Sequence, residues 1–353
     1  MVGGVAGAVG CGGARFGGGN GMPALKRPEA EIRELAAIVA KRSAGDVERA
    51  RWWDAAPPAY RWNQIAVEEM LDAFVTTTPA IRNLALLHTA IDDAMAAAAT
   101  GKPRHRRQRP SQLNGSIVPA VPVPASSLSA SGHAAAAAAA ADVLAHLLPA
   151  RAAAFQAKAE EAMQSRLLAG AEYPSEVAAG RAIGRKAAAL AIERAKSDGF
   201  DAKWSGSVPQ GPGHWKGTTP IAPLAGTWKP WVLARGDEFR PPAPPAFDAA
   251  PVKAALAALK RIERTPAATH CALYWELFGG TRGYALWNET ARTKLLEHRT
   301  IHDAVAAARV LAMLNVAYHD ATIACFEAKY AYWLIRPSQL DPDLKTIFPP
   351  PSH

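Results

Sequence analysis

A lysine followed seven residues later by an Arg-Pro pair occurs twice in the chain, at Lys102 and Arg109 and again at Lys329 and Arg336. In an unbroken helix a step of seven residues turns through about 700°, so both side chains share one face about 10 Å apart. The proline after each arginine tends to end the helix and leaves the guanidinium at its terminus. Each pair could therefore direct two positive charges at one anion, although an isolated Lys/Arg pair is more commonly two solvated cations.

Two further groups of residues in the first half of the chain favour the anion-binding interpretation. The tripeptide Ser131-Gly132-His133 opens an alanine-rich segment, and a helix that begins there presents backbone amides, a hydroxyl and an imidazole to an oxyanion. Farther along, Arg166 is followed by Glu172 and then by Glu176. Each group alone is a weak signal, but their order and spacing together are specific.

The chain also repeats itself. A shift of 227 residues places Arg82–Leu113 on Arg309–Leu340 without a gap, and 14 of the 32 positions are identical. Upstream, Trp62-Asn63 is echoed by Trp287-Asn288. We interpret this as a tandem duplication, in which the second copy stops at His353 before most of the first has been repeated.

The three groups together resemble the superfamily that unites vanadium-dependent haloperoxidases, type-2 phosphatidic acid phosphatases and bacterial acid phosphatases. Its pattern is Lys-x6-Arg-Pro, then Pro-Ser-Gly-His, then Ser-Arg-x5-His-x3-Asp. The resemblance implies helical bundles around a pocket for phosphate or vanadate, and it implies a role for each matched residue. The clamping cations would be Lys102, Arg109 and Arg166, the further donors Ser131 and the Gly132 amide, and the acid/base His133.

The first copy departs from this pattern at its end. Glu172 stands at the position of the family's catalytic histidine and Glu176 at that of the aspartate that orients it. A carboxylate cannot supply an imidazole nitrogen, and it repels a bound oxyanion. Pro103 also interrupts the helix that should align Lys102 with Arg109. With His133 and Glu172 as its candidate catalytic residues, the first copy is therefore predicted to be catalytically weak.

The second copy has a cleaner first block. Lys329 and Arg336 are expected on one continuous helix, with His353 as a further residue beside the bound anion. The resemblance implies vanadate as a cofactor for peroxide-dependent halide oxidation, with halide and peroxide as small-molecule substrates. Hydrolysis of a phosphate monoester is the alternative chemistry, and a catalytically inactive scaffold fragment is the alternative from a different functional class.

Composition and periodicity support an all-α class. The chain is 49% hydrophobic and 20% charged, which excludes a disordered protein. Apolar residues recur at helical spacing in eight segments, and strand-like alternation is scarce. We expect a Gly-rich tail over 1–28, a first helical repeat over 29–200, a Pro/Gly/Trp-rich connection over 201–250 and part of a second repeat over 251–353.

Several functional classes are disfavoured. The most apolar stretch, Ala134–Leu148, contains Asp142 and His146, so no membrane span is expected. The net charge of +9 is mild, and the basic run Lys102–Arg107 lacks flanking aromatic residues for base stacking, which argues against nucleic acid. A homo-oligomer is possible. The compartment stays open, although Ala8–Cys11 weakly resembles a lipoprotein cleavage box and would fit export.

Overall fold

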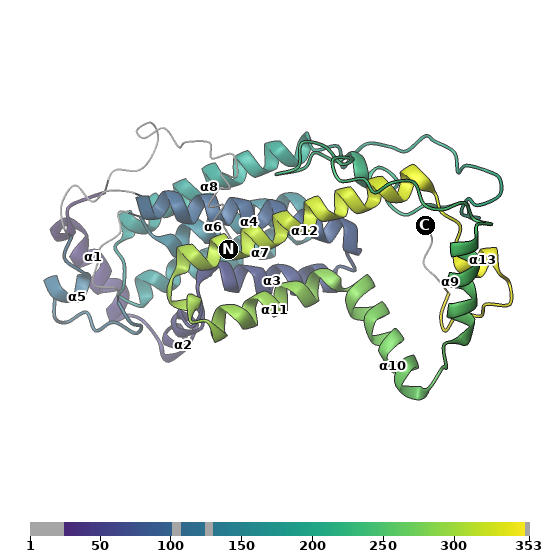
Figure 1. Cartoon of the computed structure of the whole chain (residues 1–353). Coiled ribbons are helices and arrows are strands. Elements are labelled where there is room, and N and C mark those ends of the chain that lie inside the picture. The colour runs from purple at the N-terminus through teal and green to yellow at the C-terminus, as the bar shows by residue number, and fades with distance from the viewer. Residues whose placement is uncertain (1–24, 101–106, 124–129, 350–353) are drawn as a thin grey trace, which may run out of the picture. The chain divides into compact units, whose positions relative to one another are not determined.

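The computed structural model describes residues 25–100, 107–123 and 130–349. These residues form helices joined by loops, with one isolated bridge between His214 and Leu334 and no β-sheet. The helices are α1 (Pro28–Ala40), α2 (Ala44–Asp54), α3 (Pro58–Asp72), α4 (Thr77–Thr100), α5 (Pro110–Leu113), α6 (Gly132–Leu147), α7 (Ala152–Leu168), α8 (Pro174–Lys196), α9 (Ala250–Arg261), α10 (Pro266–Trp275), α11 (Gly283–Glu297), α12 (Ala304–Tyr332) and α13 (Pro337–Leu340), with a π-helical turn at Glu276–Thr281 and 3-10 turns at Pro149–Arg151, Ala225–Thr227 and Thr300–His302 (Figure 1).

The all-α prediction is confirmed, and each of the eight periodic segments coincides with a helix. The periodicity does not reveal α2, because its apolar residues do not recur at helical spacing. The capping residues at its N-terminus define this helix instead. The Ser43 amide donates to the Asp46 carboxylate at 2.7 Å, and the Asp46 amide donates to the Ser43 hydroxyl at 3.2 Å. This reciprocal capping satisfies backbone groups that the first turn leaves unpaired.

The described residues form two compact units. Unit 1 contains the residues up to Ala73, Asn83–Arg194 and Asn288–Val316. Unit 2 contains Phe74–Arg82, Ala195–Trp287 and the residues from Ala317 onward. Each unit therefore draws on both halves of the sequence. No helix in the described ranges has both the length and the apolar character that crossing a bilayer requires.

Unit 1 is organised around the alanine-rich helix α6, which packs against α3 and α7. Helix α8 approaches α6 through two glycines. A Cβ atom at Gly180 would lie 2.3 Å from the Ser131 carbonyl oxygen, and one at Gly184 would lie 2.2 Å from that of Ala135. Only residues without a side chain permit this backbone contact. It holds the start of α6 beside the start of α8, where the Ser131 amide donates to the Glu176 carbonyl at 2.9 Å.

A buried polar network joins residues of unit 1 that the sequence repeat places at equivalent positions. Asn63 on α3 donates to Asn288 on α11 at 2.6 Å. Asn63 also contacts His88 at 2.7 Å, and Asn288 and Asn315 exchange two hydrogen bonds of 2.9 and 3.0 Å. Burial, with Arg292 nearby, lowers the pKa of His88 to about 3, so this histidine is neutral. The duplication itself stays a prediction, but its equivalent residues meet in one network.

Unit 2 is built on the second part of α12 and on residues 205–245, which we call the strap. The Asp320 carboxylate accepts hydrogen bonds from the amides of Trp231, Val232 and Leu233 at 2.8, 2.7 and 3.0 Å. The strap reaches the helix again at Gly226, where a Cβ atom would lie 2.5 Å from the Cα atom of Glu327. These contacts hold the strap along α12.

Candidate functional site

A cavity of about 510 Å³ in unit 1 brings together most of the first-copy residues that the sequence singles out. Its lining includes Arg109, Ser131, Gly132, His133, Arg166, Glu172 and Glu176. Lys102 and His353 lie outside the described residues. Lys329 and Arg336 belong to unit 2.

The cavity residues are positioned by helix ends. Arg109 stands immediately before α5, and Ser131 is the N-cap of α6, where its hydroxyl accepts a hydrogen bond from a first-turn amide. Arg166 lies in the last turn of α7. Gly170, with φ of +66°, makes the turn that follows, and Glu172 lies between this turn and α8. A left-handed residue at this point is typical of a helix C-terminus.

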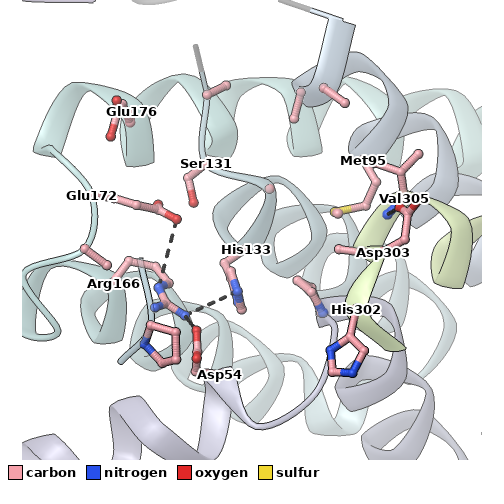
Figure 2. A pocket seen from close by; sticks show the side chains of 18 of the residues that line it. Asp54, Met95, Ser131, His133, Arg166, Glu172, Glu176, His302, Asp303 and Val305 are labelled. Carbon is pink, nitrogen blue, oxygen red and sulfur yellow. Dashed lines mark hydrogen bonds and ion pairs between the residues drawn. The ribbon is translucent and has the colours of Figure 1, made fainter. Parts of the chain in front are cut away.

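Arg166 is the central cation of the cavity, with an exposed fraction of 2%. Its Nη1 donates to Asp54 Oδ1 at 2.9 Å and to His133 Nε2 at 3.2 Å, and its Nε lies 4.0 Å from Glu172 Oε1 (Figure 2). Two carboxylates therefore offset the charge that would otherwise attract an external anion.

His133 is held in its neutral form. Burial and the neighbouring Arg166 charge lower the pKa of His133 well below its ordinary value. Since the Arg166 guanidinium can only donate, His133 Nε2 is the acceptor in their contact. In this arrangement the nitrogen has no proton to give, which disfavours the general-acid role that the resemblance implies.

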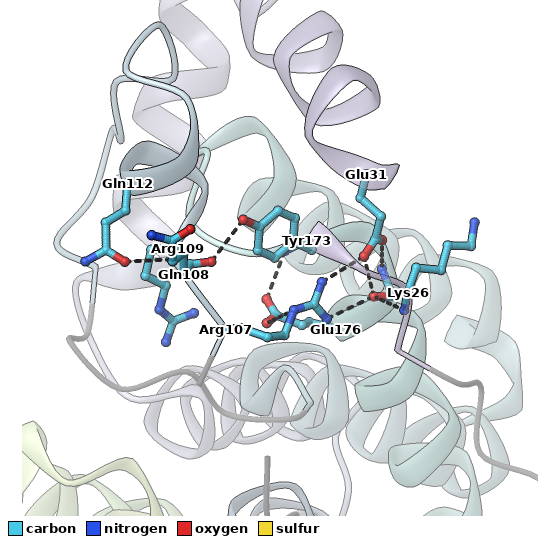
Figure 3. Close-up of polar contacts among 9 residues, drawn as sticks. Lys26, Glu31, Arg107, Gln108, Arg109, Gln112, Tyr173 and Glu176 are labelled. Carbon is cyan, nitrogen blue, oxygen red and sulfur yellow. Dashed lines mark hydrogen bonds and ion pairs between the residues drawn. The ribbon is translucent and has the colours of Figure 1, made fainter. Parts of the chain in front are cut away.

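Glu176 lies in a second cluster beside the cavity (Figure 3). Its Oε2 accepts from the Tyr173 amide at 2.9 Å, and its Oε1 lies 3.8 Å from Arg107 Nε. Burial, reinforced by the negative charge of Glu172, raises the pKa of Glu176 to about 7. Arg107 also donates to Glu31 at 2.9 Å. The position of the family's orienting aspartate is thus occupied by a carboxyl group bound into a structural ion-pair network.

Sequence reasoning missed several lining residues, among them Asp54, Met95, His302, Asp303 and Val305. They come from the end of α2, from α4 and from the start of α12, which are distant in sequence from the three motifs. For Asp303 the sequence indicates a helix cap, since an aspartate before a helix commonly caps it. In the structure its carboxylate accepts from the amides of Val305 and Ala306 at 3.1 and 3.0 Å, at the start of α12. Nothing in the local sequence connects that cap to the cavity.

The cavity of unit 1 does not fit a bound vanadate or phosphate. The cations Arg109 and Arg166 face carboxyl groups from four residues, Asp54, Glu172, Glu176 and Asp303. In a poorly solvated site these groups repel a second anion, and Arg166 is already paired.

In unit 2 the helix that carries Lys329 ends four residues before Arg336, so the prediction of one continuous helix is wrong. The proline after Arg336 holds this residue in an extended conformation, with φ of −70° and ψ of 145°. In addition, residues of the strap form backbone hydrogen bonds with the residues just before Arg336. The Trp215 amide donates to the Trp333 carbonyl at 2.8 Å, and the Ile335 amide donates to the Gly213 carbonyl at 2.9 Å.

Arg336 is nevertheless near enough for its charge to act on Lys329. Burial and the positive charge of Arg336 lower the pKa of the Lys329 ammonium. This ammonium lies 4.7 Å from the ring centre of Phe326 and 5.7 Å from that of Tyr330. Aromatic faces at these distances hold a cation in place without neutralising it. The pair fits an oxyanion better than the cavity of unit 1 does.

Comparison with known proteins supports the fold. No known sequence family and no curated protein matches the chain. Among solved structures, the chain is similar to one described as the first bacterial vanadium-dependent iodoperoxidase, with a TM-score of 0.61 and 20% sequence identity over 84% of this chain and 76% of that one. At this identity the likeness establishes the architecture, which is the all-α fold of a vanadium haloperoxidase.

Proposed function

We propose, from the premise that the chain has the fold of a vanadium haloperoxidase, that Lys329 and Arg336 bind vanadate or phosphate in unit 2. The observation that carries the proposal is that the charge of Arg336 reaches the half-buried ammonium of Lys329 near the end of α12. Two like charges repel, and an oxyanion between them replaces that repulsion with two attractions. In unit 1 the corresponding arginine shares its cavity with carboxyl groups.

The two residues would act in different ways. Arg336 presents a planar fork of N–H donors that can bind two oxygen atoms of one anion. Lys329 adds a point charge, and the rings of Phe326 and Tyr330 restrict where its ammonium can lie. Together they would neutralise the negative charge of the bound anion.

The activity we propose is peroxide-dependent oxidation of a halide. Vanadate, when bound, supplies the centre at which peroxide becomes reactive toward the halide. The similarity to an iodoperoxidase over 76% of its length supports this choice over phosphate ester hydrolysis. The residues of this chain would bind and orient the anion.

Binding is tested by isothermal titration of orthovanadate, and separately of inorganic phosphate, into the wild type and two variants. Lys329→Ala and Arg336→Ala should each weaken binding at least tenfold, which corresponds to about 1.4 kcal/mol. Lys253→Ala, an exposed lysine on α9, is the matched control and should bind as the wild type does. Equal affinities for all four proteins would refute the assignment.

Activity is tested on the same proteins with iodide or bromide, hydrogen peroxide and added orthovanadate, beside hydrolysis of p-nitrophenyl phosphate. Vanadate-dependent halide oxidation that is lost in both variants supports the proposal. Hydrolysis without halide oxidation would reassign the protein to the phosphatases. Anion binding without either reaction would refute the activity and leave a binding protein.

A further inference from the structure

We propose that the cavity of unit 1 has the donors of an oxyanion-binding site and that the carboxylate of Glu172 occupies the position of the anion. The Glu172 carboxylate would stand where a phosphate or vanadate ion would otherwise bind, so that its removal should create a second oxyanion site in the molecule. This inference goes beyond the proposed function, which concerns Lys329 and Arg336 in unit 2.

The donors of such a site converge in the cavity. Arg109 and Arg166 line it with exposed fractions of 7% and 2%, and the start of the 16-residue helix α6 adds Ser131 and the Gly132 backbone. A helix N-terminus by itself is not a binding site. The independent observation is Arg166 Nε, a buried cationic donor that makes no hydrogen bond within the described residues and lines the same cavity.

Glu172 lies against these donors. Its carboxylate points toward Ser131 and Arg166 (Figure 2). The separation of 4.0 Å between Glu172 Oε1 and Arg166 Nε is too long for a hydrogen bond, and Glu172 Oε2 is buried without a hydrogen bond among the described residues. The carboxylate thus supplies the charge that the donors need, but it does not satisfy their geometry.

The other acids of the cavity are held by different partners. Asp54 binds Arg166 Nη1 at 2.9 Å, Glu176 binds the Tyr173 amide at 2.9 Å, and Asp303 caps α12. Within the described parts of the chain, no group of three or more His, Cys, Asp or Glu side chains is arranged to hold a metal ion. The carboxylates therefore do not form a cation site, and Glu172 is the acid that lies beside Arg166 Nε without a hydrogen bond to it.

A tetrahedral anion would suit the vacated position better than a carboxylate. Its four oxygen atoms can accept hydrogen bonds from several donors at once, whereas a planar carboxylate offers two. The remaining acids weaken this binding, so a modest affinity for phosphate is expected. Glu172→Gln removes the charge at nearly constant volume, whereas Glu172→Ala also empties the space that a bound anion needs.

The experiment uses the full chain with Lys329→Ala and Arg336→Ala as its background, so that the anion site proposed for unit 2 is removed from every sample. Inorganic phosphate and orthovanadate are titrated into this parent, into the parent with Glu172→Gln and into the parent with Glu160→Gln. Glu160 is an exposed glutamate of α7 that pairs with Arg181, and it serves as the matched control. We expect at least a tenfold gain in affinity with Glu172→Gln and no gain with Glu160→Gln.

Two further variants locate the gain and guard against misfolding. Adding Arg109→Ala to Glu172→Gln should cancel the gain, because it removes a cation of the cavity. Glu172→Ala, which also empties that space, is titrated beside Glu172→Gln and should gain at least as much affinity. Circular dichroism shows whether both variants fold. The proposal is overturned if neither Glu172 variant gains affinity, or if the gain persists without Arg109. The proposed function is tested separately, by the wild type against the background variant.

Discussion

Arg109 in unit 1 and Arg336 in unit 2 start from the same local structure and have different surroundings. Each precedes the sequence Pro-Ser-Gln-Leu, and each is extended. Each backbone amide donates to the side-chain oxygen Oε1 of the glutamine three residues later, at 2.8 Å for Arg109 and 3.3 Å for Arg336. Arg109 then lines a cavity with four acidic residues, whereas Arg336 lies beside Lys329. The short motif determines the turn, and residues distant in sequence determine its electrostatics.

Asp93 and Asp320, which the repeat makes equivalent, show the same divergence. Burial, with Asp92 adding to it, raises the pKa of Asp93 to about 6. Burial also acts on Asp320, but hydrogen bonds from His319 and from three strap amides outweigh it and lower the pKa of Asp320. The amides of the strap thus stabilise the charged form of Asp320, and this carboxylate in turn holds the strap on α12.

The strongest test of this comparison removes one arginine from each unit. Arg166→Ala should cost about 3–5 kcal/mol of unfolding free energy, because it leaves Asp54 and Glu172 without their cation. Arg336→Ala also removes a repulsion with Lys329, so it should cost less than Arg166→Ala does. Urea unfolding followed by circular dichroism measures both, and a larger loss for Arg336→Ala would reverse the assignment of structural and binding roles.

The aspartate pair gives the next largest effect. Asp320→Asn weakens three charge-assisted hydrogen bonds and should cost about 2 kcal/mol. Asp93→Asn removes a carboxylate whose ionisation burial opposes, and it should be neutral or stabilising by up to about 1 kcal/mol. Melting temperatures at pH 7 compare the two. Equal losses of stability in the two variants would show that the hydrogen bonds from the strap to Asp320 do not stabilise the protein.

A pH titration should show opposite signs for the two units. The pKa of Glu176 is about 7 in the folded protein against 4.5 for the ordinary group, so the native state binds more protons between these values. Its contribution to stability is complete below pH 4.5 and is lost as the pH rises through 7. Asp320, with its lowered pKa, contributes above its ordinary pKa of 3.8 and loses that contribution as the pH falls.

Glu176→Gln should therefore flatten the decline in stability between pH 5 and pH 7 by up to about 1.4 kcal/mol per pH unit. Unfolding free energies at pH 5, 6, 7 and 8 test this, with Glu160→Gln as the exposed control. An unchanged slope would mean that Glu176 titrates as an ordinary glutamate.

The smallest effect concerns Lys329. Arg336→Gln removes the positive charge that lowers the pKa of Lys329, so this pKa should rise toward its ordinary value without reaching it, because burial remains. A lysine-labelled NMR titration can follow the Lys329 side chain in both proteins. An unchanged pKa would show that the charge of Arg336 does not act on Lys329, and it would weaken the proposal of an anion site at these two residues.

The sequence predicts the helices well because long amphipathic and alanine-rich segments have few alternatives. It also predicts which first-copy residues line the cavity of unit 1, since the motifs place Ser131 and Arg166 at helix ends. It could not predict that Asp54 and Asp303 join them, because these acids come from segments that only tertiary packing brings near. The end of α12 was predicted wrongly for the same reason, since the strap pairs with the residues before Arg336.

The hydrogen bond between Asn63 and Asn288 has a consequence for folding, since it joins residues 225 positions apart. During synthesis, Asn63 can meet His88 of α4 early, but its partner Asn288 is available only after α11 has emerged from the ribosome. Closing so long a loop adds little entropic cost, but it delays completion of the core of unit 1. In that interval the buried polar network of unit 1 is incomplete, so the polar groups of α3 and α4 that it will bury stay in contact with water.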